Sequence, residues 1–513
     1  MTHAPLDAFI AAVVEYGVTD ICIGAGSRSS AILQALNKQP VTIHPFLDER
    51  AVGFLALGIT KATQRPVMIV TTSGSAVTNV LPAITEAAQS FHNLIICTAD
   101  RPQRLRGTCA NQTINQVGIF NNALAELQLP ESQDNQSVFL EDLKQSFIKQ
   151  RSVGGPIHIN CPLEDPVLHP YQASDSVVKM GIPEPSMQPN EQKIAVVANG
   201  VSSATNGWVC IGQLEPWVNR EDIESFVKKL GWPTIVDGTN HGLKGLPNVA
   251  QYADDAVSAL TDADPDRLIY VGGPWISKKM AGAIDVYQDR VMHISQSYPP
   301  VVPLPNPTIH MNASQLVHCI DHQTGSYDMS GHNQKTNARI AQALAGDHEF
   351  KVIYQILISA SKQPFDAFIA NSSPIRYMDQ CRIPNLRQLH CNRGASGIDG
   401  NIATVIGLCL EPSDTPLIAI VGDLAALYDL NAFLMMDRVK RPLTIVIINN
   451  GGGCIFERLP IATQYEQFDE HFKLAHSQKI SSILQGMGLN TQVVLNKADI
   501  SIEFNGDITE IFC

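Results

Sequence analysis

The feature that most constrains the fold is a repeated order of short apolar segments and helical segments. Between residues 20 and 98, the apolar segments Asp20–Gly24, Pro66–Thr71 and Leu94–Thr98 alternate with the helical spacing of Gly53–Thr60 and Ala76–Ala88. Parallel strands need helical crossovers, and strands that are apolar throughout indicate helices on both faces of the sheet. The first part of the chain therefore predicts a doubly wound parallel sheet.

The same order returns in the middle and last parts of the chain. In the middle part the predicted strands are less regular, and they lie near Trp208–Gly212, Thr234–Val236, Arg267–Gly272 and Val291–Ile294. In the last part they are Ala367–Ala370, Gln388–Asn392, Leu417–Gly422 and Leu443–Asn449. We predict an α/β protein with three doubly wound parallel-sheet domains.

Two polar segments without apolar periodicity are predicted to link these parts. Gln172–Gln192 is rich in Ser, Pro and Gln, and His322–Thr336 contains two glycines. Such composition is typical of linkers. The expected domains cover residues 1–171, 193–321 and 337–513.

Composition excludes several classes of protein. Among the 513 residues, 36 Lys and Arg against 49 Asp and Glu give a net charge of −13, which argues against a nucleic-acid partner. No apolar stretch reaches the roughly 20 residues of a membrane span. The start, Met1–Tyr16, has no basic region, and the 11 cysteines are scattered without a Cys-x-x-Cys pair. We expect a cytoplasmic protein with reduced thiols and no zinc site.

The common nucleotide-binding loops are absent from the sequence. The nearest approach to a dinucleotide-binding turn is Gly24-Ala25-Gly26, but Arg28 occupies the turn and the third glycine is missing. No Gly-x-x-x-x-Gly-Lys-Ser/Thr segment occurs either. The sequence therefore disfavours NAD binding and P-loop chemistry.

The most specific motif follows two strands of the last part. One predicted strand ends in Gly422-Asp423, and the next ends in Asn449-Asn450 before three glycines; 27 residues separate Asp423 from Asn450. One helix and one strand fill that interval, so both polar ends reach the same edge of the sheet. A carboxylate, an amide oxygen and glycine carbonyls suit Mg²⁺ that also binds phosphate oxygens. The alternative is a helix cap at Asp423 and a simple turn at Asn449-Asn450.

These motifs resemble those of thiamine-diphosphate enzymes. Leu424 replaces the third glycine of most of that superfamily, but residues 422–431 and 449–456 are similar to one subgroup, the 2-succinyl-5-enolpyruvyl-6-hydroxy-3-cyclohexene-1-carboxylate (SEPHCHC) synthases of menaquinone biosynthesis. The resemblance covers the first and last parts and is weaker in the middle. It implies thiamine diphosphate beside Gly422 and Leu424, with Mg²⁺ or Mn²⁺ bound by Asp423, Asn450 and Gly452.

The resemblance also implies an organisation for the chain. Residues 1–171 would form the pyrimidine-binding domain, residues 193–321 the middle domain and residues 337–513 the diphosphate-binding domain. Ile508–Cys513 is predicted as the last strand of that domain, and the closing helix of the family does not follow it in the sequence. A homodimer or a dimer of dimers is implied, in which the activating glutamate and the diphosphate site belong to different subunits.

Glu49 matches the glutamate that activates the cofactor in this family. It follows the segment Val41–Leu47 and precedes a helix that is expected to begin near Ala51. A carboxylic acid beside N1′ of the aminopyrimidine favours the imino tautomer that removes the thiazolium proton, and burial raises the carboxyl pKa toward that role. The alternative is that Asp48-Glu49 is a solvated helix start, favoured by the helix dipole.

The substrates that the resemblance implies, 2-oxoglutarate and isochorismate, are both dicarboxylates. Arginines follow four predicted strands, as expected for bidentate recognition of carboxylates, although each could instead form a surface salt bridge. The family match assigns the succinyl carboxylate to Ser372 and Arg376. It assigns isochorismate and the covalent intermediate to Ser27, Arg28, Arg101, Asn111, Gln112, Arg393 and, least securely matched, Lys278. Ile398 matches the wedge that keeps the cofactor bent, and Ile455 and Phe456 match the apolar wall.

The activity that follows from this resemblance is decarboxylation of 2-oxoglutarate and conjugate addition of the remaining carbanion equivalent to isochorismate. One alternative is another thiamine-diphosphate decarboxylase or synthase, against which the set of arginines argues because such substrates carry fewer carboxylates. A second alternative is an inactive, truncated paralogue. Intact Glu49, Asp423 and Asn450 argue against it.

Overall fold

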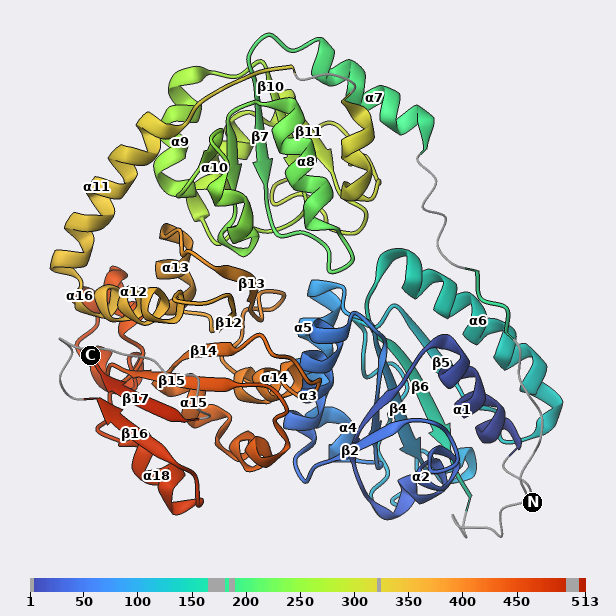
Figure 1. Ribbon diagram of the computed structural model, residues 1–513. Helices are drawn as coiled ribbons and strands as arrows, with labels where there is room; N and C mark the ends of the chain where they lie inside the picture. The colour runs from blue at the N-terminus through green and yellow to red at the C-terminus, as the bar shows by residue number, and fades with distance from the viewer. Residues whose placement is uncertain (1–3, 165–179, 184–189, 321–323, 495–506) are drawn as a thin grey trace. The chain divides into compact units, whose positions relative to one another are not determined.

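The computed structural model describes residues 4–164, 180–183, 190–320, 324–494 and 507–513, and within them it forms three parallel β-sheets (Figure 1). The chain divides into two compact units. Unit 1 comprises residues 1–186, 392–412 and 428–440, and unit 2 comprises residues 187–391, 413–427 and 441–513. The α/β class with three parallel sheets, which the alternating pattern predicts, is confirmed.

Sheet A, in unit 1, has the strand order β2-β1-β3-β4-β6-β5. Its strands are β1 (Asp20–Gly24), β2 (Thr42–Pro45), β3 (Val67–Thr71), β4 (Leu94–Asp100), β5 (Ala125–Gln128) and β6 (Ile157–Pro162). One face packs against α1 (Ala4–Tyr16), α2 (Ser30–Leu36) and α6 (Gln136–Val153) in a single apolar core. The helices α3 (Glu49–Thr63), α4 (Ser75–Asn79) and α5 (Leu81–Ser90) connect its central strands. Strand order reverses between β1 and β3, and such a reversal is where open α/β sheets bind ligands.

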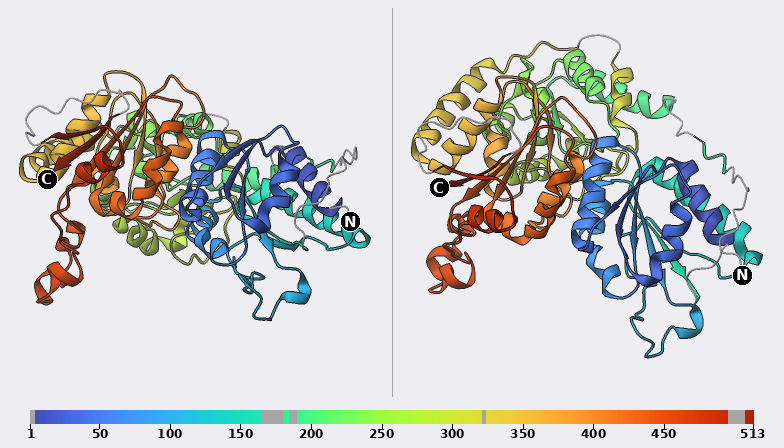
Figure 2. Two further views of the ribbon diagram at one scale, coloured as in Figure 1. Left: turned by 90° about the horizontal axis from the view of Figure 1, so that it is seen from below. Right: turned by 60° about the horizontal axis from the view of Figure 1, so that its bottom comes forward.

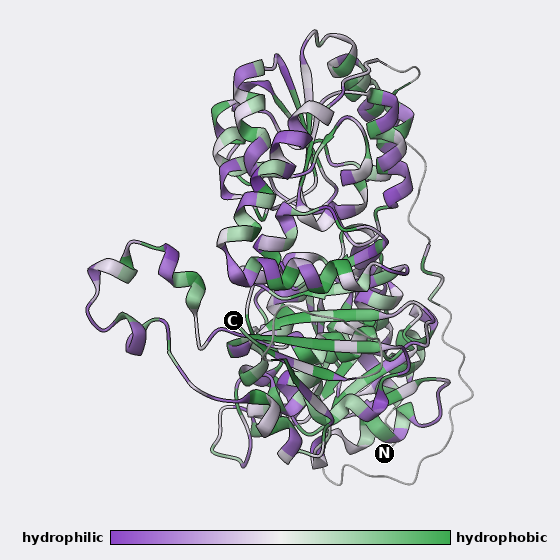
Figure 3. Cartoon of the chain, turned by 60° about the vertical axis from the view of Figure 1, so that its left-hand side comes forward, coloured by the Kyte–Doolittle hydropathy of each residue, from purple (hydrophilic) through white to green (hydrophobic). Residues whose placement is uncertain are grey.

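Sheet C, in unit 2, has the order β13-β12-β14-β15-β17-β16, which repeats the order of sheet A counted from its first strand. Its strands are β12 (Phe365–Ile369), β13 (Leu386–His390), β14 (Leu417–Gly422), β15 (Leu443–Asn449), β16 (Thr491–Val494) and β17 (Ile508–Phe512). The helices α11 (Ser330–Gly346), α12 (His348–Ala360) and α13 (Ser373–Gln380) share its core. The strands β12, β14 and β15 are buried along nearly all of their length, and Figure 3 shows hydrophobic strands in the centre of the sheet. The predicted last strand is present as β17, between β15 and β16.

Sheet B, also in unit 2, has the order β11-β10-β7-β8-β9. Its strands are β7 (Gly207–Ile211), β8 (Thr234–Val236), β9 (Val249–Ala250), β10 (Arg267–Val271) and β11 (Val291–Ile294). Apolar cores lie on both faces, with α7 (Glu191–Ser202) and α8 (Arg220–Leu230) in one core and α9 (Ala253–Ala263) and α10 (Lys278–Val286) in the other.

Unit 2 also contains the short helices α16 (Ile461–Gln464), α17 (Phe468–His471) and α18 (Ile480–Gly486). It includes all but the last residue of α15 (Asp423–Tyr428). Residues 454–472 extend away from sheet C as an arm, seen in orange-red in Figure 2. No helix among the described residues is long and apolar enough to cross a membrane.

Two sequence expectations need correction. His322–Thr336 is not a linker throughout, because α11 begins at Ser330; only Thr336 and Ile340 of this helix are buried, so no apolar period marks it. The predicted helix Ala76–Ala88 is two helices that meet at Val80, and Pro82 lies at the start of the second, where its missing N–H costs no helix hydrogen bond. Most of the predicted linker Gln172–Gln192 lies outside the described residues.

Helix α14 (Asn401–Leu408) packs directly on α3 within unit 1, as Figure 1 shows. A Cβ on Gly58 of α3 would lie 2.2 Å from the carbonyl oxygen of Thr404, and a Cβ on Gly407 would lie 2.3 Å from the carbonyl oxygen of Leu55. The two backbones therefore touch at glycines. This crossing brings the loop before α14 against the helices of sheet A.

Candidate active site

Glu49 is the first residue of α3, in unit 1. The carboxylate of Asp48 accepts a hydrogen bond from the backbone N–H of Arg50 at 2.9 Å, so Asp48 caps the helix as the alternative reading expects. Glu49 does not share that role: its Oε2 accepts from Nδ2 of Asn79 at 3.2 Å. A Cβ on Gly24 would lie only 2.6 Å from Cγ of Glu49, so the glycine at the end of β1 makes room for this carboxylate.

Arg28 lies in the turn after β1, within the 3₁₀ helix Ser27–Ser29. Its side chain is buried, and Nη1 donates to the carbonyl oxygen of Leu163 at 2.8 Å. This bond ties the end of β1 to the segment that follows β6. The guanidinium of Arg28, which the sequence analysis predicted as a carboxylate ligand, thus uses one of its N–H groups in a structural hydrogen bond. The neighbouring Ser27 is exposed.

The residues that the sequence analysis places after β4 do come together. Nε and Nη2 of Arg101 donate to the carbonyl oxygen of Asn111 at 3.1 and 2.9 Å. Gln112 binds the segment that follows β3, because its Nε2 donates to the carbonyl oxygen of Ser73 at 2.7 Å. In return the Ser73 hydroxyl donates to the carbonyl oxygen of Gln112 at 3.0 Å. The loop thus covers the carboxyl ends of β3 and β4.

Gln116 supports this loop, and sequence reasoning missed it. It is 1% exposed; its Oε1 accepts from the N–H of Gly74, and its Nε2 donates to the carbonyl of Ala99 and to Oδ1 of Asn160. A single glutamine in an irregular loop carries no local signal of burial.

Arg393 and Ile398 also belong to unit 1, on the loop before α14, where Ile398 is 40% exposed.

In unit 2, Asp423 follows β14 and begins α15. Its side chain is 3% exposed, Oδ2 accepts from the N–H of Gly452 at 2.9 Å, and Oδ1 accepts from the N–H of Leu424 at 2.7 Å. Burial raises the pKa of Asp423, and these backbone N–H groups oppose the rise. Nε2 of His476, which sequence reasoning missed, lies 3.3 Å from Oδ2. The predicted meeting of Asp423 with the glycine loop after β15 is present.

Asn450 is held by Glu349, which sequence reasoning also missed. Its Nδ2 donates to Oε2 of Glu349, on α12, at 3.1 Å. Its Oδ1 is buried and has no hydrogen-bond partner among the described residues. Burial raises the pKa of Glu349, whereas the bond from Asn450 lowers it. Because Glu349 fixes the amide, an unpaired oxygen is left as a potential ligand.

These groups fit a magnesium ion. Asp423 offers a carboxylate and Asn450 an unpaired amide oxygen. Among the described residues, the Gly452 carbonyl accepts only from the N–H of Cys454 at 2.9 Å, which leaves a second lone pair. Hard oxygen ligands in a mixed set are what Mg²⁺ takes. Within the described ranges no group of three His, Cys, Asp or Glu residues is arranged to hold a metal ion.

The glycine loop requires glycine for conformation and for space. Gly451 has φ +78° and Gly452 φ +135°, and a Cβ on Gly452 would lie 2.8 Å from the carbonyl oxygen of Lys473. Lys473 and His476 close over the loop through backbone hydrogen bonds with Gly453 at 2.6 Å and with Gly451 at 3.0 Å. The base of the arm is therefore fixed to this edge of sheet C.

Ser372 and Arg376 lie at the start of α13, after β12. Ser372 has φ +76° and ψ −135°, a backbone conformation that side chains rarely adopt. The guanidinium of the half-buried Arg376 has no hydrogen-bond or ion-pair partner among the described residues. Strained backbone of this kind occurs most often at functional sites, so Ser372 and Arg376 remain a candidate binding site.

The remaining predicted residues of unit 2 lie at other positions. Ile455 and Phe456 are half-buried at the base of the arm, where the Phe456 ring meets Phe472 edge to face at 4.9 Å. Leu424 and Gly422 are half-buried at the end of β14. Lys278 is exposed at the first position of α10, beside sheet B.

Comparisons with known proteins agree with this geometry. Residues 6–119 match the family model described as thiamine pyrophosphate enzyme, N-terminal TPP binding domain, and residues 373–506 match the corresponding C-terminal TPP binding domain. The chain is similar to three proteins named 2-succinyl-5-enolpyruvyl-6-hydroxy-3-cyclohexene-1-carboxylate synthase. The Aliivibrio fischeri protein is 30% identical over 94% of this chain and 89% of its own. The Vibrio cholerae protein is 30% identical (92% and 87%), and the Haemophilus influenzae protein 31% (92% and 86%).

Proposed function

Because the chain belongs to the family of SEPHCHC synthases among the thiamine-diphosphate enzymes, we propose that it forms SEPHCHC from 2-oxoglutarate and isochorismate in menaquinone biosynthesis. The reaction releases CO₂ from 2-oxoglutarate and forms a carbon–carbon bond between the remaining succinyl unit and the isochorismate ring. The observation that carries the proposal is the edge of sheet C, where Asp423 meets the glycine loop and Asn450 keeps an unpaired buried oxygen.

Asp423, Asn450 and Gly452 would hold Mg²⁺, or Mn²⁺, and through it the diphosphate, with Gly422 and Leu424 beside the cofactor. The chemistry that thiamine diphosphate supplies when bound is an acceptor for the electron pair that CO₂ leaves behind. Ile398 would keep the cofactor bent, and Ile455 and Phe456 would exclude water from one side of it.

Glu49 would hold the proton at N1′ of the aminopyrimidine. The bond from Asn79 keeps its carboxylate against the end of β1, where Gly24 provides the space. The position of the Glu49 carboxylate is therefore set by α3, which carries it, and by α4, which carries Asn79. A fixed carboxyl group transfers or shares a proton efficiently because its distance from the base does not vary.

The carboxylates of the substrates would be bound by arginine and other polar side chains. The unpaired Arg376 and the strained Ser372 suit the succinyl carboxylate, since a planar guanidinium binds a carboxylate through two hydrogen bonds. Ser27, Arg28, Arg101, Asn111, Gln112, Arg393 and Lys278 would line the isochorismate site. Of these, Arg28 and Arg101 already bind backbone carbonyls, so they would offer their remaining N–H groups.

The proposal includes assembly and location. We propose a homodimer or dimer of dimers in which Glu49 and the metal site come from different subunits, three domains over residues 1–171, 193–321 and 337–513, and a cytoplasmic location. The family resemblance supports the assembly, and the composition of the sequence supports the domain boundaries and the cytoplasmic location.

A product assay tests the proposed function. Purified protein is given isochorismate, 2-oxoglutarate, Mg²⁺ and thiamine diphosphate, with Glu49→Gln as the control. We expect SEPHCHC from the native chain and a loss of at least about 100-fold in kcat in the variant. CO₂ release without the adduct would instead indicate a different thiamine-diphosphate decarboxylase. Cofactor binding with neither product would indicate an inactive paralogue.

A further inference from the structure

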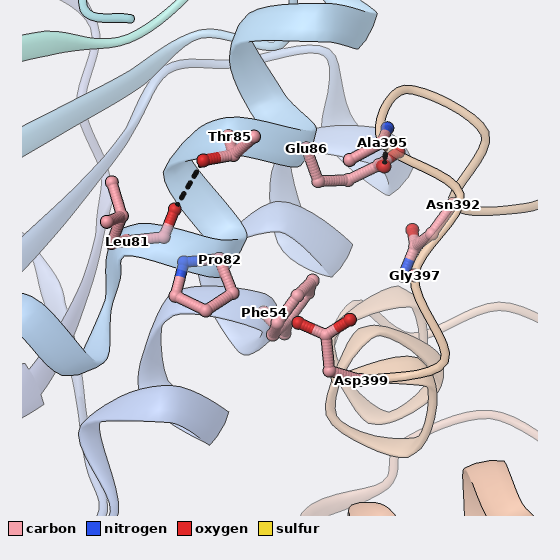
Figure 4. A pocket seen from close by; sticks show the side chains of 9 residues that line it. All are labelled: Phe54, Leu81, Pro82, Thr85, Glu86, Asn392, Ala395, Gly397 and Asp399. Atoms are coloured by element: carbon pink, nitrogen blue, oxygen red, sulfur yellow. Dashed lines mark hydrogen bonds between the residues drawn. The ribbon is translucent and has the colours of Figure 1, made fainter. Parts of the chain in front are cut away.

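Glu86, on α5 of unit 1, is a buried carboxylate whose hydrogen-bond partners are distant in the sequence. It is 2% exposed, and its Oε1 accepts from the N–H of Gly394 at 2.8 Å while its Oε2 accepts from the N–H of Ala395 at 2.6 Å. Figure 4 shows the carboxylate directed at this loop. The loop, residues 392–400, lies between β13 and α14, so the bonds cross about 300 residues of sequence.

The loop is packed closely at both of its ends. A Cβ on Gly394 would lie 2.5 Å from the carbonyl oxygen of Glu86, and a Cβ on Gly400 would lie 1.9 Å from the ring of Phe54. Gly400 has φ +64°, and Ser396 has φ +60°. The loop therefore has a defined conformation, and α3 and α5 hold it in place.

Between these two contacts the loop does not fill the space beneath it. A cavity of about 310 Å³ lies there, lined by Phe54, Leu81, Pro82, Thr85, Glu86, Asn392, Ala395, Gly397 and Asp399 (Figure 4). Apolar packing is thus missing over the middle of the loop. The hydrogen bonds of Glu86 to Gly394 and Ala395 hold the first half of the loop, together with the bond that Nδ2 of Asn392 donates to Oγ1 of Thr404 at 3.0 Å.

A carboxylate is the side chain that this position requires. Both of its oxygens accept, and two successive N–H groups face them. An amide would place an NH₂ group against one of those N–H groups, where no acceptor is available. Burial raises the pKa of Glu86, while the charge of Lys61 and the N–H groups of the loop act to lower it.

We propose that Glu86 is a positioning residue that holds loop 392–400 so that Ile398 and Arg393 are placed for the cofactor and for isochorismate. The proposal rests on the proposed function for the roles of those two residues. In this role Glu86 contacts neither the substrates nor the cofactor. Misplacement of a binding group by about 1 Å costs about 100-fold in rate, so an anchor of this kind has a measurable effect.

The test compares Glu86→Gln with Glu86→Asp, which keeps the charge on a shorter side chain, and with Thr85→Val as the control. Thr85 lines the same cavity, but its hydroxyl donates to the carbonyl of Leu81 within its own helix. Hydrogen exchange of the peptide 392–400 is measured in the protein without cofactor. The affinity for thiamine diphosphate and the KM values for isochorismate and 2-oxoglutarate are then measured.

We expect Glu86→Gln to speed exchange in peptide 392–400 at least about 10-fold, with little change in the sheet A strands. The Kd for thiamine diphosphate and the KM for isochorismate should rise, kcat/KM should fall by about 100-fold, and the KM for 2-oxoglutarate should stay nearly constant. Glu86→Asp should restore part of each loss, and Thr85→Val should change none.

Two outcomes would overturn the proposal: unchanged exchange in the loop, or faster exchange with unchanged cofactor affinity and unchanged KM for isochorismate. If Glu86→Gln does not fold, Glu86→Asp provides the same comparison. A native chain that forms no product would refute the proposed function alone, since exchange and cofactor affinity do not depend on turnover.

Discussion

Sheets A and C share one strand order, yet the equivalent helices α3 and α14, which follow the second strand of each, begin in different ways. Helix α3 is capped by its own neighbour, Asp48, which accepts from the N–H of Arg50. Helix α14 begins after Gly400, which has no side chain to cap it, and Asp429 accepts from the N–H of Ala403 from 26 residues away. One topology can thus be completed by a local cap or by a distant one.

A second pair of positions shows the same contrast. Gly74, after β3 in sheet A, has φ +83° and ψ −140°, and Ser372, after β12 in sheet C, has φ +76° and ψ −135°. Each residue precedes a helix. The glycine adopts this conformation without strain, and the serine adopts it at a cost of about 1–3 kcal/mol. This difference is consistent with the proposed role of the Ser372 hydroxyl in binding the succinyl carboxylate.

The largest expected effect tests how the edge of sheet C is anchored. In the segment Gly238–Gly245 beside sheet B, the fully buried Lys244 donates to the carbonyl oxygen of Asp379, near the end of α13, and its Nζ lies 3.8 Å from Oδ1 of Asp379. Lys244→Met leaves the buried carboxylate of Asp379 without its cation. We expect a loss of about 3–5 kcal/mol, measured by urea denaturation.

The control for this prediction is the double variant Lys244→Met, Asp379→Leu. It removes both charges and should recover much of the lost stability. An unchanged denaturation midpoint in the single variant would mean that the pair does not anchor α13.

The second largest expected effect tests whether the edges of sheets A and C have different roles toward the cofactor. Asp423→Asn, at the edge of sheet C, should raise the Kd for Mg²⁺ and thiamine diphosphate by more than about 100-fold, because loss of outer partners of a metal site alone costs about 10- to 100-fold. Glu49→Gln, at the edge of sheet A, should leave this Kd almost unchanged. Titration calorimetry measures both, and Asp469→Asn on the arm, an exposed carboxylate, controls for the charge change. Equal losses in the Asp423 and Glu49 variants would refute the division of roles.

A pH experiment separates the two helix caps. Burial raises the pKa of Asp429 to about 7, so the folded state holds a proton that the unfolded state has released between about pH 4 and 7. The contribution of Asp429 to stability therefore falls as the pH rises, by up to about 1.4 kcal/mol per unit. Asp429→Asn should remove this slope in denaturation curves recorded from pH 5 to 7.

Asp48 should behave in the opposite way. Burial acts to raise its pKa, but the hydrogen bonds from Arg50 lower it below the ordinary value. Its contribution is present at neutral pH and is lost as the pH falls through the pKa of the folded state. Asp48→Asn should therefore reduce stability at pH 7 more than at acid pH; a slope of the same sign as that of Asp429→Asn would contradict the comparison.

The smallest effect concerns the strained serine. Ser372→Gly should raise stability by roughly 1 kcal/mol, because glycine adopts φ +76° without strain, and should raise the KM for 2-oxoglutarate because the hydroxyl is lost. Gly74→Ala should lower stability, since its Cβ would lie 2.8 Å from Cγ of Gln112. Melting temperatures and KM values measure both variants. If Ser372→Gly is no more stable than the native chain and its KM for 2-oxoglutarate is unchanged, the strain at Ser372 has no role in substrate binding.

Much of the candidate site could be predicted from sequence, because strand ends and glycine turns are local features. Asp423 and Asn450 follow strands whose apolar residues are continuous, and parallel topology brings those ends to one edge. Glu49 stands at a helix start that Asp48 marks. The arginines were predicted as carboxylate ligands, but the bond of Arg28 to the Leu163 carbonyl depends on a contact 135 residues away, which spacing does not reveal.

The sequence by itself determined the three parallel sheets, the edges at which polar residues gather and the glycine positions in the loop after β15. These follow from periodicity, crossover length and turn chemistry, all of which act within about 30 residues. Only the tertiary structure decided that Glu349 orients Asn450, that Glu86 holds loop 392–400, that Asp429 caps α14 and that Lys244 is buried against Asp379. A buried polar group must find its partner wherever packing places one, and that partner has no fixed separation in the chain.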